Sequence, residues 1–284
     1  VAVEMLSDIC NQEVPEEHIA YHSPNPIRQV PTRGDIKDAI KILLSAKRPV
    51  IWAGMGVLLS GASAELTEFA ELMNIPVYTT MPGKSSIDER HPLSLGAGSG
   101  ATTLAARTWL QTSDVLFAIG SSLTMTPYAQ PIPAGKTLIQ NVASIEDINK
   151  DYDISIGLAG DTKETLAALI DEAKGQLGDN GRKGQTDVSS EIETLKQQWM
   201  AEWLPILTSN EEPLNPYRVV WDINNTIDKE NSIVTHDAGA PRDTILPFFT
   251  ATVPHSYIGW GKSTHLGYGI PLMIGAKLAE PNKF

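Results

Sequence analysis

Five short apolar segments alternate with amphipathic helices between Gly34 and Gln176, and this alternation restricts the fold more than any other feature of the sequence. The apolar segments are RPVIWAG, IPVYTT, DVLFAIG, KTLIQNV and DISIGLAG. Segments of this kind are typical of buried strands, and buried strands that alternate with helices form a parallel sheet covered on both faces. We therefore predict an α/β domain over residues 34–176.

The helices between these strands are predicted from apolar spacing and from capping residues. Asp35 can cap a helix that continues through Ala46, and Asp161 with Glu164 forms a capping box for a helix through Ala173. Further helices are expected over Ala62–Met73, Ala101–Leu110 and about Glu191–Leu207.

Trp199 and Trp203 are four residues apart on the last of these helices. Two aromatic side chains at this spacing could form a ligand surface. An apolar packing stripe is the favoured interpretation, because residues four apart lie on one face of a helix.

The rest of the chain is expected to consist of linkers and of parts of other domains. Residues 1–33 begin with the alternating segment VAVEML, expected as the last strand of a preceding domain, and continue in a proline-rich linker. Residues 177–212 are expected to form a Gly-rich linker and a helix. Residues 213–284 are expected to begin a second α/β domain, which we expect to be incomplete because a strand should follow the last helix at AEPNKF.

The composition argues against several classes of partner. A formal net charge of −12 argues against nucleic acid, because phosphate contacts need clustered Lys and Arg. No apolar stretch approaches the roughly 20 residues of a membrane span. Cys10 is the single cysteine, which excludes an internal disulfide, and we expect a buried, unreactive thiol. These features favour a cytoplasmic protein that acts on a small molecule.

The segment WAGMGV places Gly54 and Gly56 between a strand and a helix. Glycines at such a turn let a pyrophosphate approach the backbone N–H groups. However, Leu59 replaces the third glycine of the full fingerprint, and the next strand ends in Thr80 rather than in an acid that could bind a ribose. An ordinary NAD site is therefore not expected, and a tight turn without a ligand is an equal alternative.

Taken in order, these segments resemble the thiamine-diphosphate-dependent decarboxylase and carboligase superfamily, which includes acetolactate synthase, pyruvate oxidase and oxalyl-CoA decarboxylase. The resemblance is carried by RPVIWAGMGV, AELMNIPVYTTMPGKSSIDERHPLSLG, SDVLFAIGSSL, IGLAGDTKETLAAL, VTHDAGAPRD and GYGIPLMIGAKLAEPNK. The predicted fold class is therefore α/β, with a parallel, six-stranded, Rossmann-like middle domain followed by an incomplete domain of thiamine-diphosphate-binding type. The five apolar segments account for five of the six strands.

The resemblance implies a diphosphate-binding turn in the last segment. Asp237, Gly239 and Ala240 match the place where the family turns its backbone toward the diphosphate. The family often has Gln and His where this chain has Ala240 and Pro241, so side-chain contacts are lost and Arg242 is expected to compensate.

The resemblance also implies residues beside the thiamine. Leu266 matches the bulky residue under the bend of the cofactor, with its N–H and the carbonyl of Thr264 on the pyrimidine. Simple packing at a helix start is the alternative for Leu266. The catalytic glutamate of the family lies outside this chain, and the Mg²⁺ ligands are expected just after Phe284, so no catalytic or metal residue is assigned.

The middle domain binds FAD in some members of the superfamily and ADP or nothing in others. The matching turns contain Gly54, Met55, Gly56, Thr80 and Met81. Ser122 stands where flavin-binding synthases have an arginine, and the acidic strand end is replaced by QNVAS with Gln140, Asn141 and Ser144. An empty or adenine-nucleotide site is therefore favoured over FAD.

These features predict part of a thiamine-diphosphate- and Mg²⁺-dependent lyase or transferase, similar to acetolactate synthase. We expect a 2-oxo acid or acyl-CoA substrate and a homodimer or homotetramer, because active sites in the family form between subunits. The fragment alone is expected to be inactive. A noncatalytic nucleotide-binding or scaffolding module that uses the middle domain is the alternative.

Overall fold

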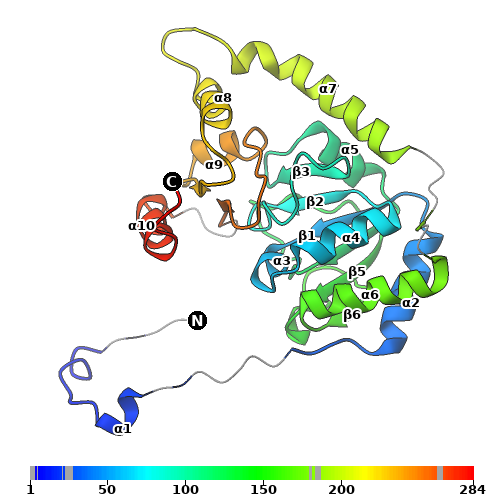
Figure 1. Ribbon diagram of the computed structural model, residues 1–284, viewed down its shortest axis with the longest axis horizontal. Helices are drawn as coiled ribbons and strands as arrows, with labels where there is room; N and C mark the ends of the chain where they lie inside the picture. The colour runs from blue at the N-terminus through cyan, green and yellow to red at the C-terminus, as the bar shows by residue number, and fades with distance from the viewer. Residues whose placement is uncertain are drawn as a thin grey trace.

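A six-stranded parallel sheet lies at the centre of the larger unit in the computed structural model (Figure 1). The structure describes residues 4, 6–20, 22, 28–178, 181–182, 187–260 and 265–284. The strands of this sheet are β1 (Pro49–Ala53), β2 (Val77–Thr80), β3 (Ser94–Gly98), β4 (Val115–Ile119), β5 (Thr137–Val142) and β6 (Ile156–Ala159). This confirms the predicted α/β fold with six parallel strands.

The strand order is β3-β2-β1-β4-β5-β6, so the chain first moves outward from β1 and then returns to build the other half from β4. Both halves therefore meet between β1 and β4, where every residue of the two strands is buried. In sheets of this type the crevice at the carboxyl ends of these two strands is the usual place for a ligand.

Strand β3 was not assigned from the sequence. Its segment, SLGAG, contains Gly96 and Gly98 and no β-branched residue, so it lacks the composition typical of strands. Gly96 has a φ of +84°, and a side chain at Gly98 would collide with Tyr78 and Thr102. Pairing with β2 and contact with the neighbouring side chains, rather than strand propensity, hold this segment in the sheet.

The helices of the middle domain follow their predicted positions closely. Helices α2 (Arg33–Ser45), α4 (Ser63–Met73) and α6 (Thr162–Leu177) pack on one another, and α5 (Leu104–Thr112) packs against β3 and α7 (Val188–Leu207). Asp161 caps α6 as predicted. The cap of α2 is Thr32 instead of Asp35, and Asp35 is the third helical residue, with its N–H bonded to the Thr32 hydroxyl.

Helix α7 joins the middle domain to the C-terminal unit through aromatic contacts. Trp199 stacks on Phe248 at 5.7 Å between ring centroids, and Trp203 contacts both Phe248 and Tyr217. These contacts confirm the packing stripe predicted from the spacing of the two tryptophans.

The C-terminal unit is a smaller α/β arrangement. It contains α8 (Pro216–Thr226), β7 (Val234–Thr235), α9 (Ala240–Ile245), β8 (Tyr257–Ile258) and α10 (Gly269–Ala279), with β7 parallel to β8. On the other side of β7, the Phe284 N–H donates to Asn231 and the Phe284 carbonyl accepts from Ile233. These two bonds have the pattern of a parallel bridge.

The N-terminal segment extends away from both units and contains the short helix α1 (Glu16–Ile19) (Figure 1). Another short helix, α3 (Met55–Leu59), follows β1 in the middle domain. Most of the predicted strand VAVEML lies outside the described residues. Cys10 is exposed, so its predicted burial is wrong. The apolar neighbours that suggested burial, such as Ile9 at 55% exposure, pack against no core.

No helix in the described ranges is both long and apolar enough to cross a membrane.

Candidate functional site

A cavity of about 610 Å³ lies at the carboxyl ends of β1, β2 and β4, at the point where the two halves of the sheet meet. It brings together all five middle-domain candidates, which are Gly54, Met55, Gly56, Thr80 and Met81. Gly259 and Trp260 of the C-terminal unit also line it. The cavity therefore lies between the middle domain and the C-terminal unit.

The two glycines after β1 have a packing role in this turn. A side chain at Gly54 would place its Cβ 2.4 Å from the Gly120 carbonyl oxygen, and one at Gly56 would meet the Gly120 Cα at 2.7 Å. The turn after β1 is thus packed directly on the backbone after β4. This contact explains the glycine pattern without a ligand, as the alternative interpretation of WAGMGV requires.

The polar residues at the end of β5 face the protein interior and have partners there. The Asn141 amide donates to the carbonyl oxygens of Leu158 and Gly160, and its oxygen accepts from Thr162. Gln140 donates to the Ser121 carbonyl. Both side chains are buried and their amide N–H groups are bonded to carbonyl oxygens, so they hold the strand ends together.

The cavity wall is rich in apolar groups and hydroxyls. Ser122, whose hydroxyl lies 2.9 Å from that of Thr124, occupies the position expected for an arginine in flavin-binding members. Among the described residues that line the cavity there is no Lys or Arg. An anionic ligand would therefore depend on backbone N–H groups and hydroxyls.

Arg242 connects the cavity to the second half of the site. Its side chain is 3% exposed, its Nη2 donates to the Tyr128 carbonyl at 3.2 Å, and its Nε lies 3.4 Å from the Met81 sulfur. Its guanidinium also lies 5.0 Å from the centre of the Tyr128 ring. These contacts are all with residues of the middle domain that line the cavity.

The turn that was predicted to bind diphosphate is open to solvent. Gly239 has a φ of +81°, and no atom of the described residues lies within 4 Å of the position that its Cβ would take. Across the described ranges, the N–H groups of Gly239 and Ala240 meet no acceptor. The turn can therefore offer two backbone donors to an anionic group.

Asp237 links this turn to the start of α10. One carboxylate oxygen accepts from the N–H groups of Ala238 and Gly267, and the other accepts from the N–H of Gly269. The N–H groups of Ala238 and Gly267 hold the pKa of this carboxyl below its ordinary value. Leu266, beside Gly267, is 75% exposed, and Thr264 lies outside the described residues.

His236 was not predicted to be part of the site. It is 4% exposed, its ring stacks on Trp260 at 5.3 Å, and its carbonyl accepts from the Trp260 indole. Burial lowers the pKa of His236, so the ring is held neutral at pH 7. The sequence showed only a scattered histidine and gave no indication of this aromatic contact.

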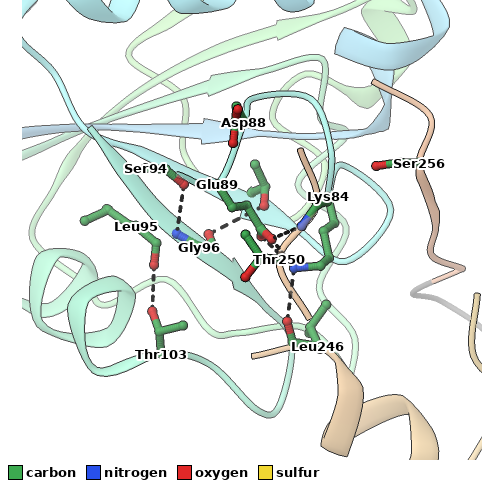
Figure 2. Close-up of polar contacts among 12 residues, drawn as sticks. Lys84, Asp88, Glu89, Ser94, Leu95, Gly96, Thr103, Leu246, Thr250 and Ser256 are labelled. Atoms are coloured by element: carbon green, nitrogen blue, oxygen red, sulfur yellow. Dashed lines mark hydrogen bonds and ion pairs between the residues drawn. The ribbon is translucent and has the colours of Figure 1, made fainter. Parts of the chain in front are cut away.

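A buried ion pair of the middle domain contacts the C-terminal unit (Figure 2). Lys84 Nζ lies 2.6 Å from both carboxylate oxygens of Glu89, and the two side chains are 1% and 7% exposed. Burial lowers the pKa of Lys84, and the charge of Glu89 opposes that change. The two charges can remain in the interior because they neutralise each other.

Both members of the ion pair also bind the backbone after α9. Lys84 donates to the Leu246 carbonyl at 3.2 Å, and Glu89 accepts from the Ala251 N–H at 2.7 Å. The Glu89 N–H donates in turn to the Ala251 carbonyl. Because α9 begins next to Gly239, the ion pair fixes the position of the open turn relative to the middle domain. Neither residue was singled out in the sequence.

A doubly wound parallel sheet with a cavity at its switch point, facing a turn with open N–H groups on a second α/β unit, is the arrangement in which α/β proteins of this type bind ligands. Comparison with known proteins identifies the family. Residues 36–169 match the thiamine pyrophosphate enzyme central domain. The chain belongs to the thiamine-diphosphate-dependent enzyme superfamily.

Several relatives align with most of this chain. Probable acetolactate synthase large subunits of Methanococcus aeolicus and Methanocaldococcus jannaschii are 33% and 34% identical, over 87% of this chain and 42% of each relative. A 3D-(3,5/4)-trihydroxycyclohexane-1,2-dione hydrolase 2 of Bacillus cereus is 29% identical, over 90% of this chain and 43% of the relative. The chain thus spans less than half the length of these relatives.

The packing role of Gly54 can be tested by its replacement with alanine. Gly54→Ala should lower the free energy of unfolding by roughly 1–3 kcal/mol, because the new Cβ collides with backbone that cannot move away easily. Gly175→Ala is the control, since Gly175 lies in α6 with no atom near the added methyl, and it should be stabilising by about 0.5–1 kcal/mol. Urea unfolding measures both, and a neutral Gly54→Ala would contradict the packing role.

The ion pair can be tested by a double-mutant cycle. Lys84→Met and Glu89→Gln should each cost roughly 3–5 kcal/mol, because each leaves an uncompensated buried charge. The double variant should cost less than the sum of the two, by at least about 1 kcal/mol. The control cycle uses Lys150 and Asp147, which are 44% and 30% exposed and should couple by less than about 1 kcal/mol. Additive effects at Lys84 and Glu89 would show that the pair does not act as a unit.

Proposed function

We propose that this chain is part of a thiamine-diphosphate- and Mg²⁺-dependent enzyme that acts on a small 2-oxo acid, as a decarboxylase or carboligase similar to acetolactate synthase. The observation that carries the proposal is the open turn at Gly239 and Ala240. The Asp237 carboxylate connects this turn to the start of α10. Membership of the superfamily supports the same cofactor.

The residues of the turn suit the proposed cofactor. The N–H groups of Gly239 and Ala240 would donate to the diphosphate, and the positive φ of Gly239 aims the turn outward. Leu266, which is 75% exposed, would lie against the thiamine. When bound, thiamine diphosphate supplies the electron sink for the reaction. The chain's own residues would bind the cofactor, orient it and exclude water from one side.

The metal ligands and the acid that activates the cofactor are not assigned to any residue of this chain. We propose that other parts of a longer protein supply them, since the relatives are more than twice as long as the aligned segment. On this proposal the 284 residues alone are inactive. The complete protein is proposed to be a cytoplasmic homodimer or homotetramer.

The substrate class is chosen by similarity. The relatives named acetolactate synthase are 33–34% identical to this chain, and the relative named as a dione hydrolase is 29% identical. A 2-oxo acid is therefore preferred, with an acyl-CoA as the next choice. A noncatalytic nucleotide-binding module is the alternative, and the cavity at the switch point is the observation in its favour.

Thiamine diphosphate with Mg²⁺ should stabilise the complete protein. A ligand that binds only the folded state at 100 times its Kd contributes about 2.7 kcal/mol, which raises Tm. Differential scanning fluorimetry measures the change, with thiamine alone as the control because it lacks the diphosphate. An unchanged Tm at saturating cofactor would favour the noncatalytic alternative.

We further propose that the cavity at the switch point does not hold FAD and is either empty or a site for an adenine nucleotide. This proposal is supported by Ser122 at the position of the flavin-binding arginine, by the bonded amides of Gln140 and Asn141, and by the absence of Lys and Arg from the described lining.

The purified complete protein should therefore lack the visible absorbance of flavin after incubation with FAD and gel filtration. Retention of stoichiometric flavin would refute the proposal, and a relative purified with bound FAD is the positive control.

A further inference from the structure

We propose that Asp237 is a positioning residue that holds the two turns of the cofactor site in register, and that it does not itself contact the diphosphate. This inference rests on the proposed function. It assigns a role to a residue that the sequence suggested only as a direct cofactor ligand.

The geometry shows that both oxygens of Asp237 are already in use. Oδ1 lies 2.7 Å from the Ala238 nitrogen and 2.9 Å from the Gly267 nitrogen. Oδ2 lies 3.2 Å from the Gly269 nitrogen. One oxygen thus accepts from the turn that contains Gly239 and also from the turn that contains Leu266, although these turns are 30 residues apart.

Charge gives a second reason for an indirect role. A carboxylate and a diphosphate are both anions, so direct contact between them would be unfavourable. The Asp237 carboxylate lies at the start of α10, a helix of 11 residues. There its negative charge is favoured by the helix dipole and by the backbone N–H groups of the first turn. Asp237 therefore holds the two turns of the site together, and the open N–H groups of Gly239 and Ala240 remain available to the ligand.

The backbone around Asp237 is shaped for this contact. Gly267 has a φ of +82°, and a Cβ at Gly269 would lie 3.2 Å from both Asp237 Oδ2 and the His236 carbonyl oxygen. Trp260 forms a second connection, because its indole donates to the His236 carbonyl and its ring lies 5.1 Å from that of Tyr268. Among the described residues, both Asp237 and Trp260 connect the two turns, and Asp237 is the charged residue of the two.

The test compares Asp237→Asn with Asp161→Asn in the complete protein. Asp161 is a matched control, because its carboxylate also accepts two N–H groups at a helix start, at 3.0 and 3.1 Å, but it lies in the middle domain at α6. Isothermal titration calorimetry with thiamine diphosphate and Mg²⁺ measures Kd, and thermal unfolding measures Tm. Asp237→Asn should weaken cofactor binding at least tenfold, and Asp161→Asn should change Kd by less than twofold at a similar loss of Tm.

Kinetics separate positioning from a general loss of structure. In Asp237→Asn the KM for thiamine diphosphate should rise at least tenfold, and saturating cofactor should restore kcat to within threefold of the unmodified protein. Gly269→Ala serves as a second variant, because its methyl group presses on Asp237 Oδ2 without removing the charge, and it should shift KM in the same direction.

Three results would overturn the proposal. These are an unchanged cofactor Kd in Asp237→Asn, an equal loss of affinity in Asp161→Asn, and a kcat that saturating cofactor fails to restore. Failure of the proposed function gives a different result, because the unmodified protein would then bind no thiamine diphosphate.

Discussion

The buried ion pair between Lys84 and Glu89 is the interaction on which the arrangement of the two units depends (Figure 2). Neither charge could stay in the interior alone, because the desolvation of each is compensated chiefly by the other and by backbone groups. Those backbone groups, at Leu246 and Ala251, belong to the C-terminal unit. An ion pair that lies within the middle domain therefore also sets where α9 and the Gly239 turn lie.

The site is built from two parts with different roles. The middle domain provides a cavity whose glycine turns pack on Gly120, so its shape follows from contact between backbones. The C-terminal unit provides an open turn that Asp237 holds against the start of α10. Arg242 contacts both parts, since it starts in α9 and ends at Tyr128 and Met81. The cavity and the turn are thus joined by buried polar contacts.

Local rules predicted most of the sheet and failed where local signals were weak. Five strands were placed correctly because each is a short apolar segment between helices. Strand β3 was missed because Gly96 and Gly98 are residues of low strand propensity. The cap of α2 was placed three residues late because Asp35 and Thr32 are both good capping residues. The burial of Cys10 was wrong because apolar neighbours in sequence do not show whether a core is near.

The sequence by itself determined the α/β class, the parallel sheet and the positions of the glycine turns, because hydrophobic period and backbone freedom act over a few residues. Only the tertiary structure decided what the charged side chains do. Asp237 accepts a hydrogen bond from an N–H group 30 residues away. Arg242 donates to a carbonyl 114 residues away, and Lys84 donates to one 162 residues away. A buried charge takes whichever partner the fold brings within about 3 Å, and local patterns carry no information about that choice.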